Sequence, residues 1–157
     1  MENNIDFFRG RYYFLSNFYD APTAYEGVIY PTSEHAYQAA KTFDLEARKL
    51  FLNGISAGQA KKLGRNIPMR PDWNTVRVNI MFYIVLDKFI RNKDLRQELI
   101  ETGDALLIEG NTWGDVFWGR VNGQGENHLG RILMAVRALF RGTPQKPEMP
   151  ALDLFCE

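Results

Sequence analysis

The chain has 157 residues, 45% of them hydrophobic and 24% charged, which is the composition of one globular domain and excludes a disordered chain. Its 19 basic and 19 acidic side chains give a formal net charge of zero. No bulk field therefore favours nucleic acid or a membrane surface, although a local basic pocket for one phosphate is compatible with this balance. With no secretory signal, no apolar run longer than residues 80 to 86 and one cysteine, Cys156, the sequence predicts a soluble, cytoplasmic protein without a membrane segment or an internal disulfide.

The predicted elements begin with strands. Residues 7 to 14 indicate two short aromatic strands broken by a glycine turn, residues 15 to 19 a loop, and residues 24 to 30 a further strand. Three polar residues lie between the large aromatic side chains: Arg9, Ser16 and Asn17. On this pattern alone they are incidental polar groups at an aromatic edge of the core.

A helix is predicted to follow Pro31. Thr32 or Ser33 can cap it, and Glu34 falls in its first turn. Four residues at the spacing of one helical face bury that side and bring aromatic groups near the carboxylate: Ala36, Tyr37, Ala40 and Phe43. An acidic residue in a first turn complements the helix dipole, and the local pattern alone favours that role for Glu34.

Two short helices are predicted next, over residues 45 to 52 with Asp44 as the cap and over residues 58 to 63 with Ser56 as the cap. Five cations gather in or after the helices of this region: Lys41, Lys61, Lys62, Arg65 and Arg70. They form either an ordinary solvated face or a clamp for a phosphate, to which the planar fork of arginine is well suited.

The longest helical pattern runs from residue 73 to about residue 91. Because it is apolar over much of its circumference, it predicts a central core helix. Asp94 with Gln97 resembles a capping box for a further helix that ends at Gly103, and residues 105 to 108 predict a buried strand. The last predicted helix follows Asn127 as its cap and ends at Gly142, before a proline-rich tail over residues 143 to 157.

The segment of residues 110 to 119 sets two tryptophans, Trp113 and Trp118, and a carboxylate, Asp115, among glycines. Aromatic platforms and a carboxylate on a permissive backbone suit a site for a flat polar ring and a sugar. This second unusual segment shifts the interpretation of Glu34 from helix dipole to chemistry.

Other chemistries lack their motifs. The possible metal ligands His35, His128 and Cys156 do not show the paired spacing of a zinc site. There is no Walker-type loop, and the run from Gly123 to Gly125 is too short for a dinucleotide fingerprint. The sequence therefore predicts no metal and no cofactor, and leaves chemistry by the two carboxylates.

Several motifs follow one another between residue 7 and about residue 140. They are Leu15-Ser16-Asn17-Phe18, Tyr30-Pro31-Thr32-Ser33-Glu34-His35 with Gln38, Ala39 and Lys41, Gly64-Arg65, Trp73, Asp115 with Trp118-Gly119, and Asn127-His128-Leu129-Gly130-Arg131. In these motifs the sequence resembles the NADAR family, also called YbiA-like.

The resemblance implies an α+β fold, a single compact and mainly helical domain over residues 1 to 142 with a small β-sheet. It also implies hydrolysis of an N-glycosidic bond between a ribose phosphate unit and a nitrogen heterocycle or amine. The substrate would be an aminouracil ribosyl phosphate of the riboflavin pathway or an ADP-ribose-type molecule. ADP-ribosylated guanine in nucleic acid is an alternative substrate, and a module that binds ADP-ribose or a related nucleotide without cleaving it is an alternative of another class.

Under the enzyme hypothesis, Glu34 is the general base or stabilises the ribosyl cation, and Asp115 orients water or the ribose hydroxyls. The expected substrate-binding residues are Arg9, Gly10, Ser16, Asn17, Phe18, Lys41, Arg65, Trp113, Trp118, Gly119 and Asn127. Among them the tryptophans would stack on the heterocycle, and Arg9, Lys41 and Arg65 would hold the phosphate. A binder of a phosphorylated ligand gains nothing from nearby carboxylates, so the presence of both acids favours the enzyme.

Overall fold

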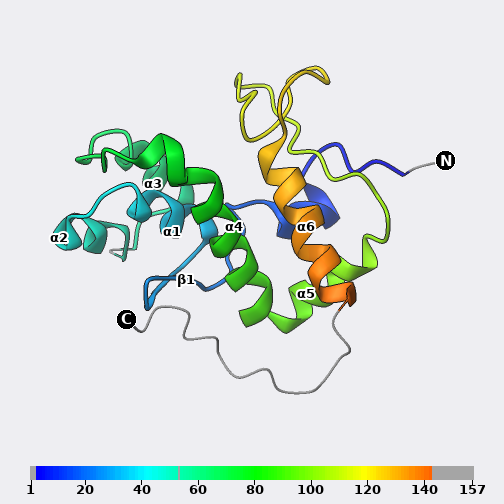
Figure 1. The fold of residues 1–157 in the computed structure, drawn as a ribbon, viewed down its shortest axis with the longest axis horizontal. Helices are drawn as coiled ribbons and strands as arrows, with labels where there is room; N and C mark the ends of the chain where they lie inside the picture. The colour runs from blue at the N-terminus through cyan, green and yellow to red at the C-terminus, as the bar shows by residue number, and fades with distance from the viewer. Residues whose placement is uncertain (1–2, 53, 143–157) are drawn as a thin grey trace.

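The structure is a computed structural model that describes residues 3–52 and 54–142, shown in Figure 1. Its elements are η1 (Gly10–Leu15), β1 (Thr23–Tyr25), β2 (Val28–Tyr30), α1 (Ser33–Ala40), α2 (Leu45–Lys49), η2 (Leu50–Leu52), α3 (Ala57–Leu63), α4 (Trp73–Arg91), α5 (Lys93–Glu101) and α6 (His128–Gly142). In these two ranges the sheet is one antiparallel pair, β1 with β2, which confirms the predicted α+β fold. No helix found there is long and apolar enough to cross a membrane. The predicted tail and Cys156 lie outside the described residues.

Helix α1 is enclosed on all sides, because each of its eight residues is buried. Of the two predicted caps, Thr32 is the one observed: its Oγ1 accepts a hydrogen bond from the His35 N–H at 3.2 Å. Small side chains at Ala36, Ala39 and Ala40 allow α3, α4 and the β1–β2 hairpin to pack closely around the helix (Figure 1). The first turn of α1 is therefore held from several directions.

Helix α4 spans the predicted range and packs against α1, α5, α6 and β1, as a central core helix should, but it is not buried around its whole circumference. One face is buried, through Trp73, Met81, Ile84, Val85, Lys88 and Phe89. On the other side Tyr83 is 49% exposed. An apolar circumference does not by itself decide how far a helix is enclosed: the shorter α1, with its small side chains, is the one buried along all of its residues.

The two aromatic strands predicted for residues 7 to 14 are absent, and η1 occupies most of this range. The Tyr12 N–H donates to the Arg9 carbonyl at 3.1 Å, and the Ser16 N–H donates to the Tyr13 carbonyl at 2.9 Å. These local bonds satisfy the backbone within three residues, so no partner strand is needed. The helical turns direct the following loop toward α1.

The strand predicted for residues 24 to 30 is a hairpin. Its two-residue turn consists of Glu26 and Gly27, both with positive φ, as such tight turns require. The predicted caps Asp44 and Ser56 are confirmed at the starts of α2 and α3, the second as a complete capping box.

Later in the chain, two local predictions were wrong. Helix α5 begins before Asp94 and lacks the predicted capping box, because Gln97 donates to Glu101 one turn further on instead. The buried strand predicted for residues 105 to 108 is reduced to one parallel bridge at Leu107. For α6 the sequence predicts an apolar face of Leu129, Ile132, Leu133, Val136, Leu139 and Phe140. The first four of these residues are buried, whereas Leu139 is 51% exposed.

Candidate active site

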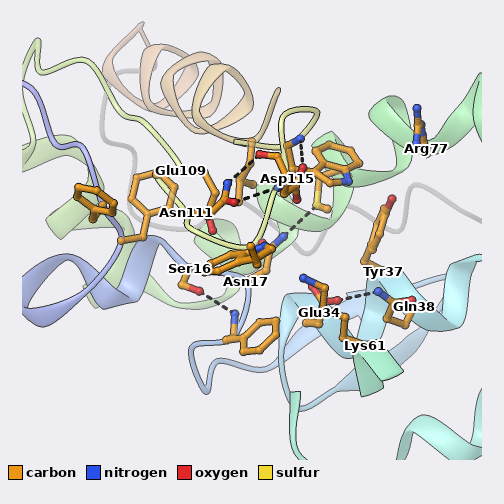
Figure 2. Close-up of a pocket in the computed structure, with 18 of the residues that line it drawn as sticks. Ser16, Asn17, Glu34, Tyr37, Gln38, Lys61, Arg77, Glu109, Asn111 and Asp115 are labelled. Carbon is orange, nitrogen blue, oxygen red and sulfur yellow. Dashed lines mark hydrogen bonds between the residues drawn. The ribbon is translucent and has the colours of Figure 1, made fainter. Parts of the chain in front are cut away.

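A cavity of about 670 Å³ opens where three parts of the chain meet (Figure 2). One wall is formed by residues 7–9, 13 and 16–18, the second by side chains of α1, α3 and α4, and the third by the loop that contains residues 109–118. Both predicted carboxylates, Glu34 and Asp115, line it together with Trp118. Glu34 and Asp115, about eighty positions apart in sequence, thus face the same cavity.

Glu34 is anchored at both its backbone and its side chain. Its N–H donates to the Asn17 carbonyl at 3.0 Å, and its Oε1 accepts from the Gln38 amide at 2.7 Å. The residue is only 6% exposed, and this burial raises the pKa of the carboxyl above its ordinary value. The Gln38 hydrogen bond and the charges of Lys61 and Lys41 oppose that rise. Glu34 is therefore a buried acid whose charged form has specific partners.

Asp115 is held in a turn of the third wall. Its Oδ1 accepts hydrogen bonds from the N–H groups of Phe117 and Trp118 at 3.1 and 2.9 Å. Its own N–H donates to Asn111 Oδ1 at 3.0 Å, and the Asn111 amide donates back to its carbonyl at 2.8 Å. These four bonds fix the carboxylate with one oxygen engaged, and no partner of Oδ2 is present in the described ranges.

A third carboxyl in the cavity, Glu109, was not predicted from the sequence. Burial and the nearby charge of Asp115 raise its pKa to about 7. Its Oε2 is buried and has no hydrogen-bond partner within residues 3–52 and 54–142. Glu109 directly follows the apolar run that was predicted as a strand, and this position was the signal in the sequence that could have indicated it.

The cations of the cavity come from several elements. Arg9, Lys41 and Arg65 line it, as does Lys61 from the predicted cation group. Arg77 on α4 also lines the cavity; it was missed because its place in an apolar helix looked structural, and Figure 2 shows it beyond Tyr37. Burial and repulsion by the neighbouring cations lower the pKa of Lys41. Such a concentration of positive charge suits an anionic ligand group.

Two tryptophans differ in their surroundings. Trp118 is half-buried and meets the Tyr37 ring edge-on, with 5.4 Å between the ring centroids. Trp113 is 62% exposed, and the Lys61 ammonium lies 5.5 Å from its ring and 5.9 Å from the ring of Phe18. These last three residues form an aromatic and cationic rim of the cavity.

The loop before α1 contributes Ser16, Asn17 and Phe18 to the cavity, as expected. Three other predicted substrate-binding residues, Gly10, Gly119 and Asn127, are not among the residues that line it. Gly10 adopts a φ of +58° at the start of η1. The remaining two pack behind the third wall.

Lys62 and Arg70, which the sequence grouped with the other cations, do not line the cavity. Arg70 instead binds Asp72 through two hydrogen bonds of 2.6 and 2.9 Å. Within the described ranges, no three His, Cys, Asp or Glu side chains are arranged to hold a metal ion.

This fold belongs to a known class of protein. The NMR structure of Escherichia coli YbiA superposes with a TM-score of 0.79 and 33% identity, covering 90% of this chain and 86% of that one. The NADAR domain model matches residues 7–141, so the chain belongs to the NADAR domain family, as its motifs indicated.

Two relatives in sequence differ in their names and in the share of their length that this chain matches. N-glycosidase YbiA of Shigella flexneri is 37% identical over 126 residues, which are 78% of this chain and 78% of that protein. A riboflavin biosynthesis protein of Vibrio vulnificus is 42% identical over 127 residues, which are 79% of this chain but 34% of that protein. The chain thus spans about a third of the length of the Vibrio relative.

Proposed function

We propose that this protein is an N-glycosidase that hydrolyses the bond between a ribose phosphate unit and a nitrogen heterocycle or amine. The observation that carries this proposal is the buried Glu34 carboxylate, in one cavity with Asp115, a set of cations and tryptophan rings. The name of the YbiA relatives, N-glycosidase, supports the reaction type. The name of the Vibrio relative supports an aminouracil ribosyl phosphate of the riboflavin pathway as the first substrate to test.

The carboxylates match the demands of the reaction. Breaking a ribosyl C–N bond passes through a state in which the sugar resembles an oxocarbenium ion, and a water molecule then adds to C1. Glu34 stabilises that cation and accepts a proton from the water, because its charged form is supported by Gln38, Lys41 and Lys61. Asp115 holds the ribose hydroxyls or the water with the oxygen that its turn leaves available.

The cations supply the opposite end of the ligand. Lys41, Arg65 and Arg9 bind the phosphate, and Lys61 and Arg77 add charge from α3 and α4. Because Lys41 is partly buried among like charges, an incoming phosphate relieves their repulsion as well as forming hydrogen bonds. An uncharged nucleoside would not relieve the repulsion between these cations.

Aromatic rings complete the site. Trp118 presents a ring that is already fixed by Tyr37, and it stacks on the departing heterocycle inside the cavity. Trp113 is exposed at the rim, where an aromatic side chain can stack on a neighbouring base. That exposed ring favours one second candidate substrate, ADP-ribosylated guanine in nucleic acid.

Incubation of the purified protein with four compounds tests the proposal: the aminouracil ribosyl phosphate, NAD, ADP-ribose and ADP-ribosylated guanosine. We expect chromatography to detect a released base from the aminouracil compound, at a rate proportional to protein concentration. Release only from ADP-ribosylated guanosine would transfer the assignment to the second candidate. Tight binding of a compound by calorimetry, with no base released from any of them, would refute the enzyme and support a binding module.

A further inference from the structure

Glu109 is the carboxyl of the cavity that has no established task. Figure 2 shows it on the wall that also carries Asn111 and Asp115. Its Oε2 is buried without a hydrogen-bond partner in the part of the chain that the structure describes. A buried carboxyl oxygen in that state is stabilised by carrying a proton, or by a ligand that accepts one.

The backbone of Glu109 is held on both sides. Its N–H donates to Asn127 Oδ1 at 3.0 Å, and its carbonyl accepts from the Arg120 N–H at 2.9 Å. Asn127 is itself buried and donates to the Leu107 carbonyl at 2.9 Å. A carboxyl on such a fixed segment keeps its position in the cavity instead of turning to solvent.

Gly119 fits against the same residue. A Cβ at position 119 would lie 2.0 Å from the Glu109 carbonyl oxygen and 3.0 Å from its Cγ, so only glycine permits this approach. Gly119 and Asn127 were expected to bind substrate, yet they do not line the cavity. Both act on the site through Glu109, which they position.

Four charged groups act on Glu109, from α1, α3, α4 and its own loop. Asp115 and Glu34 disfavour its ionised form, while Lys61 on α3 and Lys88 on α4 favour it. Burial outweighs all four, so the pKa is about 7 and a large share of the residue carries its proton at neutral pH. Burial raises the pKa of Glu34 as well, but there the Gln38 amide donates directly to the carboxylate and opposes that rise.

We propose that Glu109 is the general acid of the reaction and protonates the nitrogen that leaves the ribose. The inference rests on the proposed N-glycosidase function. As the C1–N bond breaks, its electron pair stays on the nitrogen, which takes the proton of the Glu109 carboxyl. The water that adds to C1 gives its proton to Glu34. Glu109 ends as the carboxylate and Glu34 as the acid, and exchange of one proton with solvent at each restores both.

A pair of substrates tests this role. Glu109→Gln is expected to lower the turnover of the aminouracil ribosyl phosphate at least about a hundredfold, the scale of one acid catalyst. It should also remove the alkaline limb of the pH profile, which in the wild type falls near the pKa of about 7. Turnover of 4-nitrophenyl ribofuranoside 5-phosphate should change little, because nitrophenolate leaves without a proton.

Three variants complete the design. Glu109→Asp keeps an acid, withdrawn by one methylene, and should retain the alkaline limb at reduced turnover. Glu34→Gln should slow both substrates, whereas Glu101→Gln, an exposed carboxyl on α5 outside the cavity, should slow neither. Thermal unfolding of each variant establishes that it is folded.

The outcomes separate the two proposals. A wild type that releases a base from none of the four candidate compounds and does not cleave the nitrophenyl substrate overturns the N-glycosidase and the acid role together. The acid role alone is overturned if the wild type cleaves both substrates and Glu109→Gln keeps the alkaline limb of the pH profile. It is also overturned if Glu109→Gln loses the same factor in turnover on both substrates. If only the aminouracil compound is cleaved, the alkaline limb decides.

Discussion

Replacing Glu34 with glutamine removes the charge from the first turn of α1 and keeps nearly the same shape. The Gln38 amide, which donates to Glu34 Oε1 at 2.7 Å, can donate equally to the new carbonyl oxygen. The substitution therefore leaves the packing of α1 intact. It tests whether the charge acts on the ligand or on the helix dipole.

The expected loss in turnover is large. A charge about 4 Å from a developing cation is worth about 4 kcal/mol at an effective dielectric constant of about 20, or roughly a thousandfold in rate. Solvation and the loss of one proton acceptor change that figure, but a folded variant should lose at least about a hundredfold. A helix-dipole role predicts unchanged turnover and a stability loss of at most about 1 kcal/mol.

The pH dependence of stability gives an independent test of the role of Glu34. Because the pKa of Glu34 is raised by burial, its contribution to stability is fully present below the unfolded pKa and is lost as pH rises through the folded pKa. Glu34→Gln lacks this loss, so its stability relative to the wild type should improve from acid to neutral pH. A charge that only complements the dipole predicts the opposite trend.

Melting temperature, ligand affinity and turnover should be measured on the same preparations. Glu46→Gln is the matched control, since Glu46 lies in the first turn of α2, is exposed and does not line the cavity. We expect the control to keep full activity and to show only the small stability effects of the helix dipole and of the exposed ion pair of Glu46 with Lys49. A folded Glu34→Gln protein with the turnover of the wild type would refute the catalytic assignment.

Arg65→Ala should raise KM about tenfold or more with a smaller effect on kcat, because charge-assisted bonds to a phosphate act mainly in binding. Steady-state kinetics with an unchanged KM and a collapsed kcat would instead put Arg65 at the reacting bond. Gly64→Ala places a Cβ 1.9 Å from Gln38 Oε1 and should lower kcat by displacing that amide, whereas Gly58→Ala on α3, 3.9 Å from its nearest neighbour, should not. Equal kcat values for these two variants would contradict the positioning role of Gln38. Burial lowers the pKa of Lys88 from 10.5 to about 7, so wild-type stability should fall as pH decreases through that window, and Lys88→Met should flatten the slope in urea unfolding. An equally steep slope in the variant would exclude Lys88 as its source.

Much of the helical structure could be predicted because its signals are local. The caps Thr32, Asp44 and Ser56 each accept hydrogen bonds from N–H groups two or three residues ahead, so their side chains mark a helix start without help from the rest of the chain. The aromatic run at residues 7 to 14 carried no such signal. Its conformation depends on packing against distant segments, and β-propensity alone gave the wrong element.

Asp115 could be found in the sequence because it stands in a glycine-rich aromatic loop, and that segment shifted the interpretation of Glu34, whose capped first turn alone indicated a helix-dipole role. The structure adds that Glu34 is tied to the loop before it through the Asn17 carbonyl. A single sequence does not reveal this hydrogen bond, since it forms only when α1 packs against the loop. The demands of the chemistry therefore predicted the shared cavity, whereas the spacing of the residues along the chain could not.

Glu109 shows why the remaining part of the site escaped prediction. An acidic residue after a short apolar run looks like the end of a strand, and that position is the one local signal for Glu109. Its environment is built by Gly119 and Asn127, ten and eighteen positions later, through close contact and one hydrogen bond. The motifs led us to expect that these two residues bind substrate, whereas in the structure they lie behind the cavity wall that carries Glu109. Residues that position a functional side chain carry as strong a sequence signal as the side chain itself, and only the three-dimensional contacts tell the two apart.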